Sequence, residues 1–189
     1  MAIRFYDEVI AAKLKKWIPS NSKLRVLKTD ETARLFETLA DDSGDKNVKL
    51  PLIALSRGKD IELLSNIKSL QSFNGLSLYK NQKETIQLNV IPIKVDYQLD
   101  IYTKTYEEGD EYLRNFLFKL INNPQIVIDI PYNDTWVRHT ANIRVDSSVS
   151  DTSDITEHLF AGQFTRWSIK FELQDAFLFN VPVKKNWRL

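Results

Sequence analysis

Strict two-residue alternation near the C-terminus is the sequence feature that most constrains the fold. Two sets of side chains alternate there, a mostly apolar set and a polar set: Thr165, Trp167, Ile169, Phe171 and Leu173 against Arg166, Ser168, Lys170, Glu172 and Gln174. Because successive side chains of a β-strand point to opposite faces, this pattern predicts a strand with one buried and one exposed face. Half-exposed strands are typical of antiparallel sheets, since strands of parallel sheets are buried on both faces. The segment therefore favours an antiparallel sheet.

A second alternating segment contains a change of parity. Apolar residues recur at every second position in two runs: Ile86, Leu88 and Val90, then Ile93, Val95, Tyr97, Leu99 and Ile101. The parity changes at Ile91–Pro92, and one extra residue moves the apolar set to the other face of a strand. The sequence therefore predicts a bulge or a bend at Pro92.

The segment after this strand has the signals of a helix with a defined start and end. Thr105 and Glu108 form a capping-box pattern, and Asn122–Pro124 ends the helix. The residues expected on its buried face are Tyr106, Leu113, Phe116, Leu117, Leu120 and Ile121. A helix with a single apolar stripe buries that stripe against another element, so we expect this helix to pack across the sheet.

Further elements precede and follow this unit. An apolar stripe predicts an N-terminal helix that buries Tyr6, Val9, Ile10, Leu14, Trp17 and Ile18, and Thr29–Asp30 can cap a second short helix that ends near Ala40. The other predicted strands are Leu24–Lys28, Lys49–Leu55, Gln125–Ile130 and Trp136–Asp146. We expect Lys49–Leu55 at a sheet edge, because Pro51 cannot donate to a ladder. Asp146–Asp154 is polar and is predicted to be a loop.

Together these elements predict an α+β fold. Its expected form is a mostly antiparallel, twisted sheet with a long helix packed across it and additional N-terminal helices. No repeat and no low-complexity linker divides the sequence. Residues 1–189 are therefore expected to form a single domain with an N-terminal helix and a short C-terminal tail.

Composition argues against several classes of protein. Lys and Arg total 26 against 25 Asp and Glu, and this balance argues against a dedicated nucleic-acid or membrane-surface binder. The absence of cysteine excludes disulfides, thiol catalysis and cysteine-based metal sites. No apolar run approaches the roughly 20 residues that cross a bilayer, and the N-terminus lacks the apolar core of a signal peptide. We expect a soluble protein of a reducing compartment.

The polar residues contain no recognisable catalytic motif. His139 alternates with the apolar side of a strand, which predicts a hydrogen-bonded core histidine rather than a zinc ligand, and His158 is expected in a solvated loop. Asp146, Ser148, Ser150 and Glu157 follow EF-hand spacing, but the required glycine is replaced by Asp151. The carboxylates Glu107, Glu108, Asp110 and Glu111 suit the N-terminal end of a helix dipole better than acid–base catalysis. We therefore expect no catalytic residue, no metal, no cofactor and no enzymatic activity, with a carboxylate-dependent hydrolase as the least favoured alternative.

The residues expected at a partner interface lie in two polar segments and one aromatic cluster. They are Asp146, Asp151, Asp154, Phe177, Phe179, Lys184, Lys185, Trp187 and Arg188. Trp and Arg are favoured anchors of protein interfaces, so the basic, aromatic tail can dock on a neighbouring subunit. The alternative interpretation of the tail is an ordinary frayed terminus.

Three segments resemble a known protein family. They are the proline-led strand Val90–Lys104, the acidic helix start Tyr106–Asp110, and the strand Phe164–Leu173 with the aromatic cluster after it. These segments are similar to those of the tail sheath stabiliser and completion proteins of contractile-tailed bacteriophages. Lys49–Leu55 is similar to an earlier proline-bearing strand of that family. The likeness extends over most of residues 49–183 and rests on the order and pattern of the strands.

The resemblance implies a structural role in the virion. Such proteins form a hexameric ring at the head-proximal end of the tail, so the implied partners are further copies of the chain, the tail tube and sheath proteins, and neck or head–tail connector proteins. The implied location is the tail or neck of the virion, assembled in the host cytoplasm. No membrane and no specific nucleic-acid binding is implied, although DNA can pass through the lumen of a ring. The alternative is a monomeric assembly factor or protein-binding module.

Overall fold

A computed structural model describes residues 3–19, 23–27, 50–64, 76–80, 84–88, 90–132, 135–151 and 164–179. Its helices are α1 (Ile3–Lys15) and α3 (Tyr106–Asn122). Its strands are β1 (Lys23–Leu27), β2 (Leu52–Leu63), β3 (Leu76–Lys80), β4 (Glu84–Leu88), β5 (Val90–Thr103), β6 (Gln125–Tyr132), β7 (Thr135–Asp151) and β8 (Thr165–Phe179).

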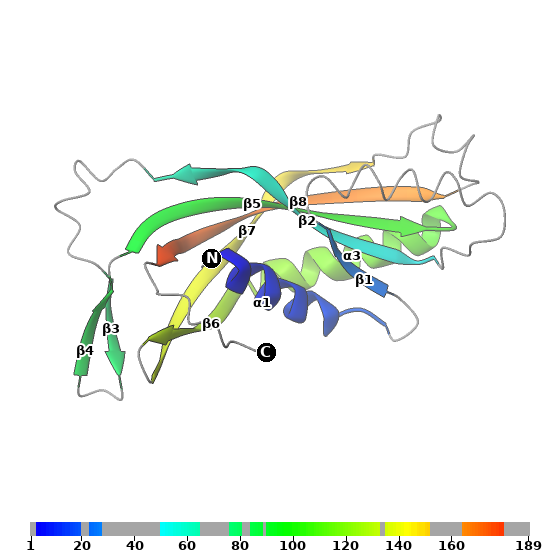
Figure 1. Ribbon diagram of the computed structural model, residues 1–189. Coiled ribbons are helices and arrows are strands. Elements are labelled where there is room, and N and C mark those ends of the chain that lie inside the picture. Colours follow the sequence, from blue (N-terminus) through cyan, green and yellow to red (C-terminus); the bar gives the residue numbers. More distant parts are fainter. Residues whose placement is uncertain are drawn as a thin grey trace.

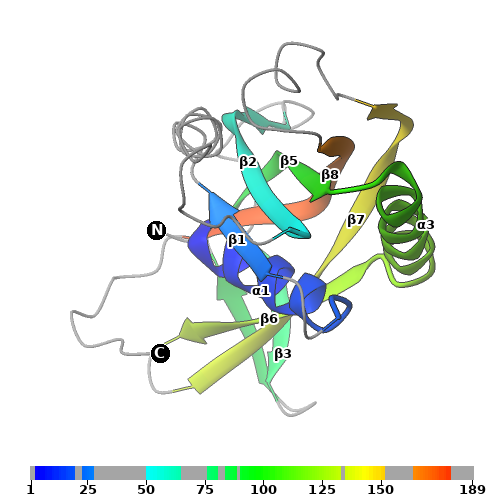
Figure 2. The same ribbon diagram turned by 90° about the vertical axis from the view of Figure 1, so that its right-hand side faces the viewer.

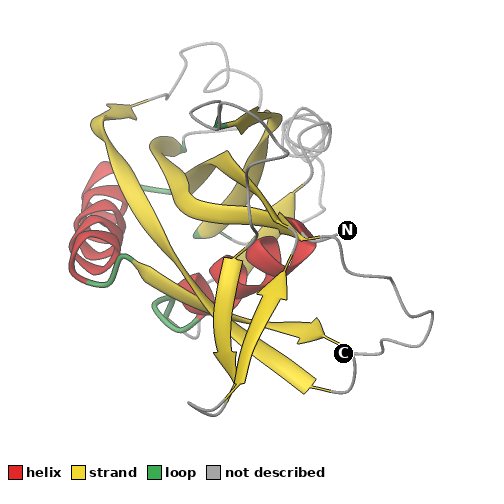
Figure 3. Ribbon diagram, turned by 90° about the vertical axis from the view of Figure 1, so that its left-hand side faces the viewer, coloured by secondary structure: helices red, strands yellow, loops and turns green. Residues whose placement is uncertain are grey.

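Six of the strands form one sheet in the order β1-β2-β5-β8-β7-β6 (Figure 1). Every neighbouring pair is antiparallel except β1 and β2, which are parallel. Strands β3 and β4 pair separately with each other, as the lower pair of arrows in Figure 3 shows. The predicted α+β class and its mostly antiparallel sheet are confirmed.

The core lies on one face of the six-stranded sheet. The buried residues of that face alternate along the two central strands: Ile93, Val95, Tyr97, Leu99 and Ile101 on β5, and Ile169, Phe171 and Leu173 on β8. Both helices contribute buried side chains to the same apolar cluster, and Figure 1 shows both on the same side of β5 and β8. The alternation seen in the sequence therefore identified the inner face of both strands.

Helix α1 lies between the two edges of the curled sheet. It contacts both β1 and β6, which are the first and last strands of the sheet order (Figure 2). Tyr6, Ile10 and Leu14 are buried, as the apolar stripe predicted. The Tyr6 hydroxyl accepts a hydrogen bond from the backbone N–H of Phe177 at 2.8 Å, and the Lys13 ammonium donates to the backbone carbonyl of Gln125. Both contacts join α1 to strands distant in the sequence.

Helix α3 begins where the sequence predicted and contacts β5, β7 and β8. The Thr105 hydroxyl accepts a hydrogen bond from the backbone N–H of Glu108 at 3.3 Å, which is the first half of the predicted capping box. The prediction that Tyr106 and Ile121 are buried was wrong, because their side chains are 53% and 63% exposed. The buried stripe instead includes Tyr112, because a helix turns about 100° per residue and Ile121 is already outside the stripe that contains Leu120.

Gly109 allows α3 to approach the sheet closely. A Cβ atom at this position would lie 2.9 Å from the Thr103 hydroxyl oxygen and 2.9 Å from Cδ1 of the Trp167 indole. Alanine normally stabilises a helix interior by about 1 kcal/mol relative to glycine, whereas overpacking costs about 1–3 kcal/mol. We therefore expect Gly109→Ala to lower the free energy of unfolding in urea titrations. Asp110→Ala at the exposed neighbouring position is the control, and a Gly109→Ala protein more stable than wild type would contradict the close approach.

Two predictions about strand boundaries were wrong. Strand β2 is an interior strand between β1 and β5, not an edge strand, because its ladder begins at Leu52 and leaves Pro51 just outside it. The predicted loop at Asp146–Asp154 is strand as far as Asp151, because Val149, Ser150 and Asp151 continue the pairing with β8 after a register shift. The polar composition of this segment predicted a loop. It forms strand because β8 pairs with these three residues, and composition does not show which segment will be the neighbour.

The parity change near Pro92 corresponds to two features. Strand β4 belongs to the separate two-stranded sheet, and β5 begins at Val90 in the main sheet. The pairing of β5 with β8 shifts register between Ile93 and Val95, where β8 contains one extra residue. A bulge is therefore present near the predicted position, but on the partner strand.

Some predictions fall on residues outside the described ranges. They are the second short helix after Thr29–Asp30, His158, Glu157, Asp154 and the tail at residues 184–189. Among the helices that the structure describes, neither is long and apolar enough to cross a membrane.

Candidate functional site

A polar groove of about 560 Å³ lies along the central strands of the sheet. Its lining comes from four adjacent strands: Ser56, Arg57 and Gly58 of β2; Lys94, Asp96, Tyr97 and Gln98 of β5; Lys170, Phe171 and Glu172 of β8; and Asp146 of β7. Lys94, Asp96 and Gln98 alternate with the buried Val95 and Tyr97, which places their side chains on the outer face. The groove therefore belongs to the polar side of the central strands.

Irregularities in two strands flank the groove. The pairing of β2 with β5 shifts register between Arg57 and Ile61, and the pairing of β7 with β8 shifts between Val145 and Val149. Bulges bend a strand and increase its twist. Between them β5 and β8 pair regularly, with Asp96 opposite Glu172 and Gln98 opposite Lys170. The groove thus has a regular two-stranded floor between two bulged strands.

Several charges of the groove are paired within the protein. The Lys94 ammonium lies 2.9 Å from a Glu172 carboxylate oxygen and 3.5 Å from Glu62, and Arg144 lies 3.6 Å from the other Glu172 oxygen. The hydrogen bond and charge of Glu172 raise the pKa of Lys94. The hydrogen bond from Lys94 in turn lowers the pKa of Glu172. These pairs link β2, β5, β8 and β7 by side-chain charges of alternating sign.

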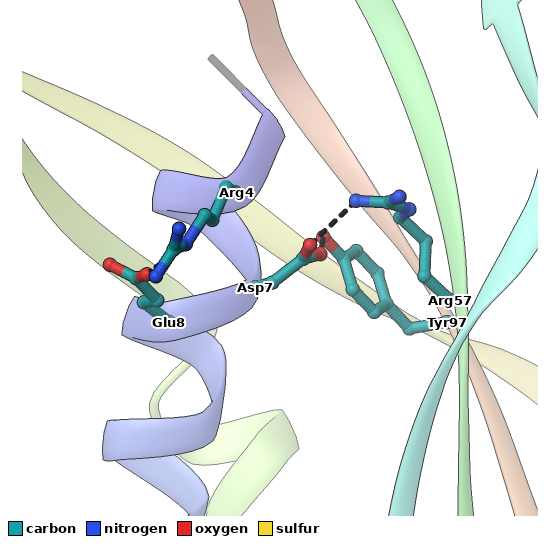
Figure 4. A network of polar contacts seen from close by, with 5 residues as sticks. All are labelled: Arg4, Asp7, Glu8, Arg57 and Tyr97. Atoms are coloured by element: carbon teal, nitrogen blue, oxygen red, sulfur yellow. Dashed lines mark hydrogen bonds and ion pairs between the residues drawn. The ribbon is translucent and has the colours of Figure 1, made fainter. Parts of the chain in front are cut away.

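Arg57 is also among the lining residues, but its side chain lies on the helix side of the sheet, because Arg57 pairs with the inward-facing Tyr97, and it contacts helix α1 (Figure 4). Its guanidinium lies 2.6 Å from one carboxylate oxygen of Asp7, and the Tyr97 hydroxyl donates to the other at 2.9 Å. Burial raises the pKa of Asp7, and the hydrogen bond from Tyr97 and the charge of Arg57 act in the opposite direction. Burial and the Asp7 carboxylate raise the pKa of Tyr97. The three side chains join α1 to β2 and β5.

Three charged side chains of the groove have no such partner. Lys170, Asp96 and Asp146 are exposed, and no hydrogen bond or ion pair of their side chains occurs within the part of the chain that the structure describes. Lys170 belongs to β8, which lies between the strands of Asp96 and Asp146. Lys170 thus lies between the strands of two carboxylates that, like it, form no hydrogen bond or ion pair among the described residues, although the charge of Asp96 helps to raise the pKa of Lys94.

A buried polar cluster lies farther along the same face. One carboxylate oxygen of Asp100 accepts from the Ser168 hydroxyl at 2.5 Å and from the Gln98 amide at 2.8 Å. Arg166 approaches the other oxygen at 3.4 Å, and its guanidinium carbon lies 5.6 Å from the centre of the Tyr102 ring. Because the Asp100 and Arg166 side chains are only 1% and 14% exposed, this cluster joins β5 to β8 rather than offering groups to a ligand.

The predicted interface residues that the structure describes lie at different places on the sheet. Asp146 lines the groove, and the exposed Asp151 pairs with Trp167 at the other end of β8 from Phe177. Phe177 packs against the core, with its ring centre 5.0 Å from that of His139. Phe179 ends β8 opposite Val90. Asp154, Lys184, Lys185, Trp187 and Arg188 lie outside the described residues.

Sequence reasoning missed Lys170 and Asp96 as site residues. Each was visible as a charged position of an alternating strand, but a charged outer face is the ordinary state of a half-exposed strand. Only the pairing of β5 with β8 and the register shifts of β2 and β7 bring these charges to a common groove.

His139 is the hydrogen-bonded core histidine that the sequence predicted. It is 6% exposed, and its Nε2 donates to the backbone carbonyl of Asp175 at 2.9 Å. Asp175 has a φ of 58° in the bulge of β8, and the Asn142 amide donates to its carboxylate at 2.8 Å. In the described part of the chain no group of three or more His, Asp and Glu side chains is arranged to hold a metal ion. Asp146, Ser148 and Ser150 lie in β7, not in an EF-hand loop.

The burial of His139 predicts a pH dependence of stability. Burial lowers its pKa below the ordinary value of 6.5, so the unfolded chain binds more protons than the folded chain just below that pH. We therefore expect the free energy of unfolding to fall between about pH 7 and about pH 5.5. Urea titrations at both values should show a smaller pH dependence in His139→Gln, whose amide can still donate to the Asp175 carbonyl. An unchanged pH dependence in that variant would contradict the assignment.

Comparisons with known proteins identify no family. No protein-family model matches the chain, and no curated protein matches it.

Proposed function

We propose that this chain is a structural subunit of a contractile phage tail. In this proposal it forms a ring, expected to be a hexamer, at the head-proximal end of the tail, where it caps the tube, stabilises the sheath and joins the tail to the neck. Its partners are further copies of itself, tube and sheath proteins, and neck or connector proteins, and DNA can pass through the ring. The role places the protein in the virion after assembly in the host cytoplasm, and it requires neither catalysis nor a cofactor.

The observation that carries the proposal is the contiguity of the segments on which the family resemblance rests. Val90–Lys104 and Phe164–Leu173 contain β5 and β8 residues that pair with each other along the centre of the sheet. Tyr106–Asp110 begins α3, which contacts both strands. Three segments chosen by sequence pattern thus form one structural unit. Within the proposal, α3 is the long helix that lies across the sheet, and α1 is the first of the expected N-terminal helices.

Exposed apolar side chains support contact with other protein chains. Phe118 and Ile121 of α3 are 65% and 63% exposed and are neighbours on the helix surface, since they are three residues apart. Val127 of β6 is also exposed. Large exposed apolar groups favour burial at a protein interface.

Imaging of the parent particle tests the proposal directly. Cryo-electron microscopy should show a closed ring of this chain between the tube and the neck, and mass photometry of the purified protein should detect the same oligomer or a monomer that joins the ring only on the tube. A protein that is monomeric at high concentration and absent from purified particles would overturn it.

The C-terminal tail provides a separate prediction. Deleting residues 184–189 should leave the fold intact, because the last strand of the sheet, β8, ends at Phe179. It should weaken attachment to neighbouring proteins by removing Trp187 and Arg188, which have the chemistry of interface anchors. Complementation of a deletion phage should then give unstable sheaths or unjoined heads. Wild-type yield of infectious particles would identify the tail as an ordinary chain end.

The polar groove favours a second candidate function, a monomeric assembly factor or protein-binding module. A concave site with unpaired charges of both signs is suited to recognise another chain without self-association. The two functions differ in whether the protein remains in the mature particle, which quantitative mass spectrometry of purified virions measures.

A further inference from the structure

We propose that the polar groove binds a short extended peptide segment of another chain, in which an acidic side chain stands between two basic ones. The inference does not depend on the proposed role in a phage tail, because it rests on the groove alone. It assigns a ligand class to the groove residues and to Asp146 in particular.

The charges that remain available define the ligand. Lys94 and Glu172 are paired with each other, and Arg57 is paired with Asp7. The side chains without a hydrogen bond or ion pair among the described residues are Asp96, Lys170 and Asp146, taken in strand order β5, β8, β7. A ligand in the groove therefore meets negative, positive and negative charge in sequence.

Simple ions fit this arrangement poorly. An anion that approaches Lys170 also approaches the carboxylates of Asp96 and Asp146, and a cation between those carboxylates is repelled by Lys170. A ligand with charges of both signs, in the complementary order positive, negative and positive, pairs with all three. Such complementarity contributes chiefly to specificity and to the rate of association.

The spacing of the charges matches an extended chain. Asp96 and Asp146 lie two strands apart. Asp96 is opposite Glu172 of β8, and Asp146 comes directly after the residue opposite Phe171, so the two are also offset by about two residues along the strands. With strands about 4.8 Å apart and about 3.4 Å per residue, their backbones are separated by about 12 Å. Residues i and i+4 of an extended peptide project to the same side about 13 Å apart, with residue i+2 between them.

The shape of the site is consistent with such a segment. The groove volume of about 560 Å³ falls within the range of about 300–1,000 Å³ that is usual for small-molecule sites, so a short peptide segment can enter it only in part. Strands β2 and β7, which contain the register shifts, lie on either side of the paired strands β5 and β8. At Gly58 a Cβ atom would lie 3.4 Å from the Asp96 side chain, so this flank follows the floor closely.

Nuclear magnetic resonance of the ¹⁵N-labelled full chain tests the proposal. The probe is the peptide acetyl-Lys-Thr-Glu-Thr-Lys-amide, and the comparison ligands are acetyl-Glu-Thr-Lys-Thr-Glu-amide and inorganic phosphate. We expect the probe to shift the amide signals of Gly58, Gln98 and Lys170 saturably, at least about fivefold more tightly than the peptide of inverted charge, with a dissociation constant below about 1 mM.

Two variants separate charge recognition from general surface effects. Lys170→Glu should weaken binding of the probe at least about fivefold, whereas Lys104→Glu, an exposed change outside the groove lining, should leave it unchanged. The spectrum of each free variant checks that it is folded. Equal binding of both peptides, binding of phosphate at Lys170, or no saturable shift with the probe would each overturn the proposal and identify the groove as a solvated sheet face.

Discussion

Phe116→Asp is expected to unfold or aggregate the protein. Phe116 is 0% exposed and belongs to the apolar cluster that α3 shares with the sheet. Truncating a buried phenylalanine costs about 3–5 kcal/mol, and burying a carboxylate without a partner adds a further penalty. Because the whole stability of a domain is about 5–15 kcal/mol, we expect loss of soluble protein or of the cooperative unfolding transition in circular dichroism.

Phe118→Asp on the same helix is the matched control. Its side chain is 65% exposed, so the same chemical change should alter the free energy of unfolding by only about 0.5 kcal/mol. A soluble, cooperatively folding Phe116→Asp protein would show that α3 does not bury the face assigned to it.

Asp100→Ala is expected to cause the second largest loss of stability. The substitution removes the acceptor of Ser168 and Gln98 and leaves the Arg166 guanidinium, 14% exposed, without the Asp100 carboxylate. Removing one member of a buried ion pair costs about 3–5 kcal/mol, because the remaining charge stays away from water. Urea titration followed by tryptophan fluorescence should show a lower midpoint.

Two further variants test this explanation. Asp96→Ala on the same strand is exposed and should change stability little. Adding Arg166→Met to Asp100→Ala removes the cation that has lost the Asp100 carboxylate and should recover part of the loss. Equal effects of Asp96→Ala and Asp100→Ala would contradict a structural role for the buried cluster.

Local patterns were sufficient to predict the elements that have one buried face. The alternation at Ile93–Ile101 and Ile169–Leu173 identified the inner face of β5 and β8, because a strand in a half-buried sheet repeats every two residues. The stripe with Tyr6, Ile10 and Leu14 identified α1, and the cap at Thr105 located the start of α3. In each case the signal lies within a few residues of the chain.

The remaining features depend on which segments become neighbours. Residues 149–151 of the predicted loop form strand because β8 pairs with them after a register shift, and Pro51 is compatible with an interior strand because the ladder begins one residue later. Asp100 occupies a polar position of an alternating strand, yet it is buried beside Ser168, which is 68 residues away in the sequence.

Periodicity and capping are properties of adjacent residues, so the apolar faces of β5, β8 and α1 and the start of α3 could be predicted from local patterns. Strand order, register and the groove follow from how distant segments pack. Lys170, Asp96 and Asp146 are common surface residues in the sequence and become one site only when β5, β8 and β7 lie side by side. Pairing between distant segments follows from the packing of the whole sheet, which no local pattern encodes.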